Sequence, residues 1–223
     1  SMKVHQRVFP LYSQKGLLNA FLAVSNQPYA TDPEVATIIA EGNTRVLTAR
    51  FYDAKFFYAE DRKKSIDDHG IKLEGMRWVR NGGTMADKVK RIAAISRDWA
   101  PKFNANPDDC HRAAMLCKND LCTMMVTEFP KLQGHVGKLL ATFDGEKATV
   151  AEALESHYLP KYSGDNIASE PVSQTVACAD RWDTLTGCFR LNLQPKGSGD
   201  PLGLRRAANG LLSTLIHSNT AIN

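Results

Sequence analysis

The stretch PVSQTVACADRWDTLTGCFRLNLQPKGSGDPLGLRRAANGLL, residues 171–212, predicts two helices joined by a glycine-rich loop. Pro171 is a favourable residue for the first turn of the first helix. Asp180, Asp183 and Thr184 follow at i, i+3 and i+4, so this spacing places them on one side of that helix. Its buried face is predicted from the apolar residues that recur at helical spacing: Val172, Val176, Ala179 and Leu185.

The second half of this stretch joins a flexible loop to a basic helix. Pro195–Gly199 is rich in glycine, and Asp200 followed by Pro201 predicts a helix N-cap and the first helical residue. Arg205 and Arg206 then fall in the second turn of this helix. Acidic side chains, loop amides and two guanidinium groups together favour a polyanion or metal surface, although each group also has an ordinary structural use.

These residues resemble a known family, the beta subunits of bacterial two-subunit glycyl-tRNA synthetases. The resemblance is carried by ADRWDTL at 179–185, PKGSGDP at 195–201 and LRRAA at 204–208. Arg181 and Trp182 stand where the family pattern has Lys and Leu, and Gly199 stands where it has a lysine. Further matches in the same order cover nearly the whole chain: His5–Arg7, Phe21–Asn26, Gly42–Leu47, Asp53–Phe57, Asp87–Val89, Lys118–Leu121 and His157–Pro160. The family's subunit is much longer, so the resemblance implies an internal piece of it.

The composition is that of an ordinary globular domain. Of the 223 residues, 43% are hydrophobic and 23% charged, and the net charge of +4 permits nucleic-acid contact without demanding it. No run approaches the roughly 18 apolar residues of a membrane span, and no signal peptide is evident. The five cysteines lack CxxC spacing, which argues against a disulfide framework or a four-cysteine zinc site. We expect a cytoplasmic protein with reduced thiols.

The N-terminal part predicts a hairpin followed by a long helix. Val4–Leu11 and Leu17–Val24 are apolar, aromatic-bearing runs separated by a turn-forming segment, which indicates a hairpin with a longer loop. Asp32 followed by Pro33 predicts the start of a helix. Its periodicity is interrupted at Gly42-Asn43 and then resumes, so we expect a long or kinked helix that ends near Glu60-Asp61.

The rest of the chain predicts a series of helices. Asn81–Gly83 is a turn signal, and Thr84 predicts the cap of a helix. Pro107 opens another helix, whose apolar residues extend to Met125, and Thr149 with Glu152 has the T-x-x-E pattern of a capping box. The predicted fold is therefore mainly α, with an α+β portion over residues 1–65 and a helical domain over residues 66–223.

The family resemblance implies that this helical domain is similar to HD-type phosphohydrolases. Those enzymes hold a divalent metal with one histidine, a His-Asp pair and a further aspartate. In this sequence the matching positions are Asp87, the pair Asn119-Asp120, and Asp180, so both ligand histidines are missing. Asn119 is a weaker transition-metal ligand than imidazole, and we therefore expect a vestigial site without metal. The three aspartates could still bind Mg²⁺ weakly if they converge, and a metal-dependent HD-type phosphohydrolase remains an alternative.

The candidate tRNA-binding residues are basic groups and loop amides. Phosphate contact needs convergent cations or unpaired amides, which Lys196, Gly197, Ser198, Arg205 and Arg206 can supply. Successive helical residues point about 100° apart, so we expect one arginine to face outward, toward RNA, with Lys196. The other is then expected to pair with Asp180 or Asp183. The alternative is that the arginines pair with these aspartates or with Asp200 and only fix the loop.

The resemblance implies a part of an enzyme rather than a complete one. The family joins glycine to tRNA(Gly) using ATP and Mg²⁺, with amino-acid activation on a separate alpha subunit and tRNA binding on beta, in a heterotetramer. The sequence contains no P-loop, no GxGxxG pattern and no GxSxG nucleophile motif. We therefore expect no catalytic residue and no cofactor in this chain. Its expected partners are the alpha subunit and tRNA(Gly), without DNA or a membrane, and a purely structural spacer remains a further alternative.

Overall fold

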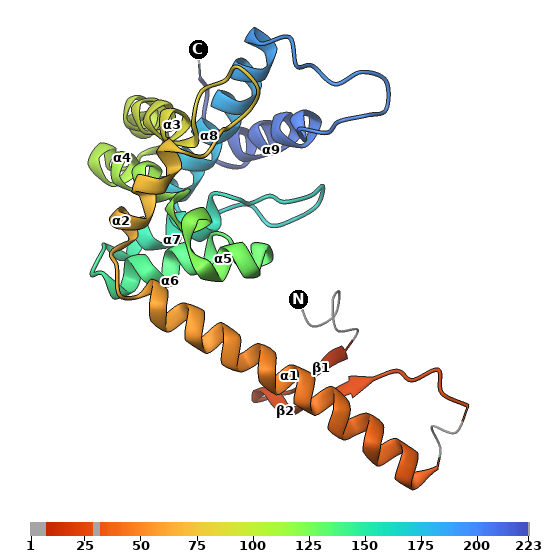
Figure 1. The fold of residues 1–223 in the computed structure, drawn as a ribbon. Helices are drawn as coiled ribbons and strands as arrows, with labels where there is room; N and C mark the ends of the chain where they lie inside the picture. The colour runs from red at the N-terminus through yellow and green to blue at the C-terminus, as the bar shows by residue number, and fades with distance from the viewer. Residues whose placement is uncertain (1–7, 29–31, 223) are drawn as a thin grey trace. The chain divides into compact units, whose positions relative to one another are not determined.

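A computed structural model of the chain describes residues 8–28 and 32–222. It is mainly α, as predicted. The chain forms two compact units, Ser1–Glu60 and Asp61–Asn223, each of which is described by itself (Figure 1). No helix among the described residues combines the length and apolar character needed to cross a bilayer.

The N-terminal unit begins with the predicted hairpin. Strand β1, Val8–Ser13, pairs antiparallel with β2, Gly16–Ala23 (Figure 1). The expected longer loop is wrong, because only Gln14 and Lys15 separate the strands. Gly16 has a φ of +114°, a conformation that glycine adopts without a side-chain clash, and this allows so short a turn. The expected start of the first strand, Val4–Arg7, lies outside the described residues.

Helix α1, Pro33–Asp61, follows the hairpin and starts where the sequence predicts. The Asp32 carboxylate accepts a hydrogen bond from the Glu34 amide at 2.9 Å, which caps the first turn. The helix continues through Gly42 and Asn43 and ends at Asp61, so the expectation of a long helix ending near Glu60-Asp61 is confirmed. The Asn43 side chain donates to the Ile39 carbonyl at 2.9 Å, within the helix, and leaves the backbone ladder intact.

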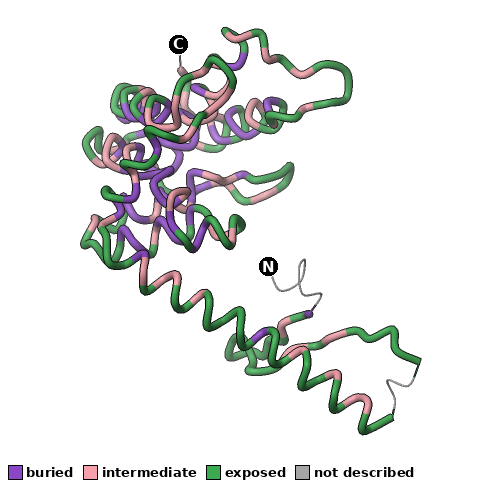
Figure 2. The backbone as a smooth tube through the Cα atoms, in the orientation of Figure 1, coloured by how far each residue is buried: buried purple, intermediate pink, exposed green. Residues whose placement is uncertain are grey.

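The helical unit is built around α8, Pro171–Arg190, which contacts the helices α3, α4, α7 and α9 (Figure 1). Every residue from Val172 to Ala179 is buried, so the first half of α8 is covered on all sides rather than on one face. Small side chains such as Ser173, Ala177 and Ala179 allow the neighbouring helices to approach closely. Figure 2 shows that most of the buried residues lie in this unit. Its helices are α2 Ile66–Gly70, α3 Met85–Trp99, α4 Pro107–Leu116, α5 Met124–Glu128, α6 His135–Phe143, α7 Ala148–Ser156, α8 and α9 Leu204–His217, with 3-10 turns at Ile71–Glu74, Ala100–Phe103, Asn119–Cys122 and Pro130–Leu132.

Buried carboxylates cap two of the short helices. Asp61 accepts from the amides of Met124 and Met125, both at 2.9 Å, at the start of α5. Asp120 accepts from the amides of Gly134 and Gly137 at 2.5 and 3.2 Å, at the start of α6. Each carboxylate satisfies amides that have no partner within their own helix.

Three sequence predictions of helix boundaries are wrong. Helix α4 ends at Leu116 instead of continuing to Met125, because the chain turns through a 3-10 segment and Thr123 then caps α5. Thr149 lies inside α7, whose N-cap is Lys147, so it forms no capping box. Helix α9 starts at Leu204 rather than Pro201, which places Arg205 and Arg206 in its first turn.

The late start of α9 has a clear local cause. Gly203 adopts a left-handed conformation with a φ of +67° immediately before the helix. This allows the Asp200 carboxylate to reach the amides of Leu204 and Arg205, at 2.8 and 2.9 Å. Asp200 therefore caps the helix as its residue type predicts, but from further back in the chain.

Candidate functional site

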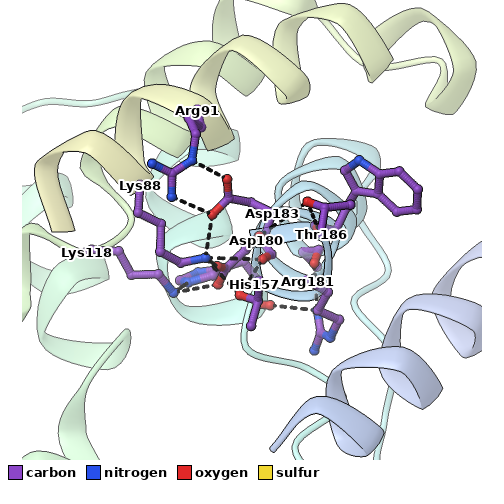
Figure 3. A network of polar contacts seen from close by, with 11 residues as sticks. Lys88, Arg91, Lys118, His157, Asp180, Arg181, Asp183 and Thr186 are labelled. Atoms are coloured by element: carbon purple, nitrogen blue, oxygen red, sulfur yellow. Dashed lines mark hydrogen bonds and ion pairs between the residues drawn. The ribbon is translucent and has the colours of Figure 1, made fainter. Parts of the chain in front are cut away.

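A cluster of five charged side chains lies where α3 and α8 meet the turn that follows α4 (Figure 3). We call it the lysine–aspartate cluster; it comprises Lys88, Arg91, Lys118, Asp180 and Asp183. Helix α8 supplies both aspartates, which share one side as predicted. The Lys88 ammonium lies 2.8 Å from Asp180 Oδ1 and 3.1 Å from Asp183 Oδ2. One ammonium group therefore bridges the two carboxylates.

The remaining oxygens of both aspartates are also paired. Arg91 holds Asp183 with two hydrogen bonds, from Nε at 2.6 Å and from Nη2 at 3.2 Å. Lys118 Nζ lies 2.7 Å from Asp180 Oδ2. Burial by itself would raise the pKa of Asp180, but the charges of Lys118 and Lys88 outweigh it and hold that pKa well below its usual range. Asp180 is therefore ionised, and each of its oxygens faces an ammonium group.

His157 completes this arrangement as a neutral imidazole. Its Nε2 lies 2.8 Å from Lys118 Nζ, and its Nδ1 lies 3.0 Å from the Ala153 carbonyl. Because the ammonium can only donate, Nε2 must accept and the proton resides on Nδ1. Burial and the nearby charge of Lys118 both lower the pKa of His157 well below its usual value. A general base at neutral pH needs an acceptor atom that is free to take a proton from the substrate. The acceptor atoms of His157 and Asp180 are instead engaged by ammonium groups.

The four positions that the family resemblance relates to an HD-type metal site do not converge. Asp87 lies at the exposed start of α3, where it forms a capping box with Thr84. The Asn119 side chain donates to the Ile66 carbonyl at 3.1 Å, and Asp120 caps α6. Asp180 is held by the two lysines. Across residues 8–28 and 32–222, no three His, Cys, Asp or Glu side chains come together as a cation site, so the geometry gives the hydrolase alternative no support.

Arg181 points away from the cluster and organises the loop that follows α7 (Figure 3). Its guanidinium donates to the carbonyls of Tyr158 and Pro160, each at 3.2 Å, and of Leu159 at 2.7 Å. Gly210 of α9 lies directly over this group, since a Cβ there would meet Arg181 Nε at 2.6 Å. Arg181 thus joins the 157–160 loop to α8 through neutral carbonyls, and Gly210 of α9 packs against it. No carboxylate among the described residues lies within ion-pair distance of it.

The two arginines of α9 have different contacts. Arg205 folds back onto the glycine-rich loop, where its guanidinium lies 2.6 Å from the Gly197 carbonyl and 3.4 Å from those of Ser198 and Gly199. Arg206 instead lines a cleft of about 690 Å³. The expected pairing of one arginine with Asp180 or Asp183 is wrong, because Lys88, Arg91 and Lys118 hold these two aspartates.

The cleft beside Arg206, which we call the basic cleft, also brings Lys131 and Lys161 together with Tyr158, Asp180 and Arg181. Lys131, Lys161 and Arg206 are exposed, as is Lys196 in the neighbouring loop. Within the described residues none of these four side chains forms a hydrogen bond or an ion pair, so they remain open to an anion.

Sequence reasoning missed most of these charged side chains. Lys88, Arg91, Lys118 and Arg181 belong to no recognised metal or nucleotide motif, and their partners lie far away in the sequence. One signal was available, because Lys88 and Arg91 are at i and i+3 next to the buried residues Val89 and Ile92. A lysine that is buried among such apolar residues is almost always paired with an acidic group.

Comparison with known proteins points to the same family as the residue matches. The family model described as "Glycyl-tRNA synthetase beta subunit" matches residues 1–223. The "Glycine--tRNA ligase beta subunit" of Neisseria meningitidis serogroup C is 41% identical over 224 residues, which cover 100% of this chain and 32% of that protein. The proteins of the same name from Chromohalobacter salexigens and Mannheimia succiniciproducens are 43% and 41% identical over 97% and 100% of the chain. The chain thus spans about a third of the length of these relatives.

Proposed function

The chain belongs to the family of glycyl-tRNA synthetase beta subunits, and from this premise we propose that it is a tRNA-binding and assembly part of glycine–tRNA ligase. The whole enzyme joins glycine to tRNA(Gly) with ATP and Mg²⁺, and its alpha subunit activates the amino acid. This chain then contributes RNA binding and contacts with the alpha subunit, without a catalytic residue or a cofactor of its own. A purely structural spacer is the competing function.

One observation carries this proposal: three exposed cations line one cleft, a fourth lies in the loop before α9, and no described acidic side chain neutralises them. They are Lys131, Lys161, Lys196 and Arg206. Binding to nucleic-acid backbones is largely electrostatic, and unpaired lysines and arginines at the surface are the groups that contact phosphates. A spacer that only separates other domains has no need for such a set.

The two arginines of α9 provide the test, because they differ in their contacts. Arg206→Ala removes a free cation, whereas Arg205→Ala removes the contacts that hold Gly197–Gly199. In the assembled alpha–beta enzyme, we expect Arg206→Ala to weaken tRNA(Gly) binding. The salt slope of log K should become shallower by about 0.7–0.9 for the phosphate contact that is lost.

Arg205→Ala should leave this salt slope unchanged, since its guanidinium is occupied by loop carbonyls. It should instead increase hydrogen exchange in the loop. Lys196→Ala serves as a second cation variant and should behave like Arg206→Ala. Wild-type affinity and salt slope in both cation variants would leave only the spacer function.

A further inference from the structure

The basic cleft has features of a small-molecule site that a flat RNA-binding surface does not need. We propose that this cleft binds one phosphorylated nucleoside, with Lys131, Lys161 and Arg206 on the phosphate and the apolar walls of Pro130 and Leu202 beside the base. The nucleotide can belong to the bound RNA, in which case the inference rests on the proposed function and adds a defined nucleotide pocket to it. It can equally be a free mononucleotide, which the cleft would bind independently of RNA.

Charge is the first argument for a phosphate. The rim carries three exposed cations, Lys131, Lys161 and Arg206, and Arg181 adds a fourth positive charge to the lining. Asp180 is the one acidic residue that lines the cleft. Both of its oxygens already lie within 2.8 Å of an ammonium group, Lys88 on Oδ1 and Lys118 on Oδ2. A bound anion therefore meets a net positive surface instead of a bare carboxylate.

The polar groups beneath the cleft are fixed before any ligand arrives. The Lys118 ammonium lies between Asp180, His157 and the face of the Tyr158 ring, whose centroid is 4.2 Å away. Arg181 is held by the carbonyls of the loop from residue 157 to residue 160. These contacts make the floor rigid, and rigid sites lose less conformational entropy on binding.

The size and the walls of the cleft favour a nucleoside over an isolated phosphate ion. Its volume of about 690 Å³ falls in the range of sites for small organic ligands. Pro130, Pro160 and Leu202 give it apolar walls against which a base can pack. The Tyr158 ring is already in contact with Lys118 and with the His157 ring, whose centroid lies 3.9 Å away, so it supports these walls from below. Phosphate alone would use the cations and leave these walls in contact with water.

Two of the first amides of α9 are already occupied. The amides of Leu204 and Arg205 are taken by the Asp200 carboxylate at 2.8 and 2.9 Å. Side chains therefore have to supply most of the contacts with the phosphate. Lys131 and Lys161 belong to the set of exposed cations behind the proposed function, but the variants that test that function leave them unchanged. They therefore allow a separate experiment.

The experiment compares Lys131→Glu/Lys161→Glu with the control Lys196→Glu in the full-length beta subunit assembled with its alpha subunit. All three substitutions are on exposed side chains, and thermal melting checks that the variants are folded. The probes are cytidine 5′-monophosphate and inorganic phosphate, both measured by calorimetry, and a tRNA(Gly) transcript measured across salt concentrations. Lys196 does not line the cleft, so its variant should bind the mononucleotide as the wild type does.

Loss of mononucleotide binding by about tenfold or more in the double variant, with tRNA binding unchanged, would identify a site for a free nucleotide. Loss of both mononucleotide binding and tRNA affinity would place a nucleotide of the RNA in the cleft. Loss of tRNA affinity alone would leave only surface contacts with phosphates and would overturn the nucleotide pocket. Unchanged binding of both probes in the folded double variant would overturn the inference. If Lys196→Glu still weakened tRNA binding in that case, the proposed function would stand while the nucleotide pocket failed.

Discussion

Lys118 Nζ lies 2.7 Å from Asp180 Oδ2, and this contact joins the turn after α4 to the middle of α8. Lys118 directly precedes the pair Asn119-Asp120 that the family resemblance related to metal binding, and Asp180 is the last of those positions. Where the related positions would bind a metal ion, the Asp180 carboxylate is paired with the Lys118 ammonium group instead. The charge of Asp180 therefore stabilises the packing of helices.

The first prediction concerns the loss of this ammonium group. Lys118→Met leaves Asp180 Oδ2 and His157 Nε2 without their donor in a buried environment. We expect the free energy of unfolding to fall by about 2–4 kcal/mol. This loss is smaller than for a carboxylate left without any partner, because Lys88 still pairs with the other Asp180 oxygen. Denaturant unfolding of the chain measures this loss.

The matched control for this variant is Lys90→Met on α3, where the lysine is exposed. A surface substitution of this kind should change the free energy of unfolding by no more than about 0.5 kcal/mol. Equal losses of unfolding free energy in the two variants would mean that the Lys118–Asp180 contact does not stabilise the fold.

The second prediction is a pH dependence of stability that originates at His157. Burial and Lys118 depress its pKa in the folded chain, while the unfolded chain titrates near the ordinary value of about 6.5. Below that pH His157 is protonated in the unfolded state but stays neutral in the folded state. The contribution of His157 to the free energy of unfolding is therefore fully present above about pH 6.5. It decreases as the pH falls, by at most about 1.4 kcal/mol per pH unit.

The groups that face His157 keep their charges over this range, because Lys118 and Arg181 remain protonated and Asp180 remains ionised. Unfolding of the chain and of His157→Gln between pH 7.5 and 5.5 provides the measurement. Gln can still accept from Lys118 but does not titrate, so its curve should be flatter. Parallel curves for the two proteins would assign the pH dependence to other residues.

The third prediction concerns Arg181 and the loop of residues 157–160. Arg181→Met removes the donors of several carbonyls at once, and buried acceptors without partners are costly. We expect a loss of about 2–3 kcal/mol and faster hydrogen exchange in this loop. Arg181→Lys, the residue of the family pattern, should lose less. The exposed Arg190→Met is the control, and unchanged exchange in the 157–160 loop would refute the role given to Arg181.

The fourth prediction concerns metal content. Asp87 and Asp120 act as helix caps, and Asn119 donates to the Ile66 carbonyl, so none of the three is directed at a shared cation. Elemental analysis of the purified full-length beta subunit should find less than stoichiometric zinc, iron and manganese. Stoichiometric metal that disappears in Asp120→Ala would revive the phosphohydrolase alternative.

The sequence alone determined where several helices start and which family the chain belongs to. Asp32 before Pro33, Thr84 three residues before Asp87, and Pro171 each act through hydrogen bonds or steric effects within one turn, and the helices start where these signals predict. The side of α8 that carries Asp180 and Asp183 was also predictable, since helical spacing fixes it. The ordered residue matches indicated the family that the comparisons establish.

Only the tertiary structure decided which cations hold these aspartates. Arg205 and Arg206 are closer in sequence and have suitable chemistry, but Lys88 and Lys118 lie 92 and 62 positions before Asp180 and form the contacts. The outcome depends on how α3 and the turn after α4 pack against the buried half of α8, which no local spacing encodes. With Asp180 and Asp183 satisfied in this way, Arg206 remains free to face the basic cleft.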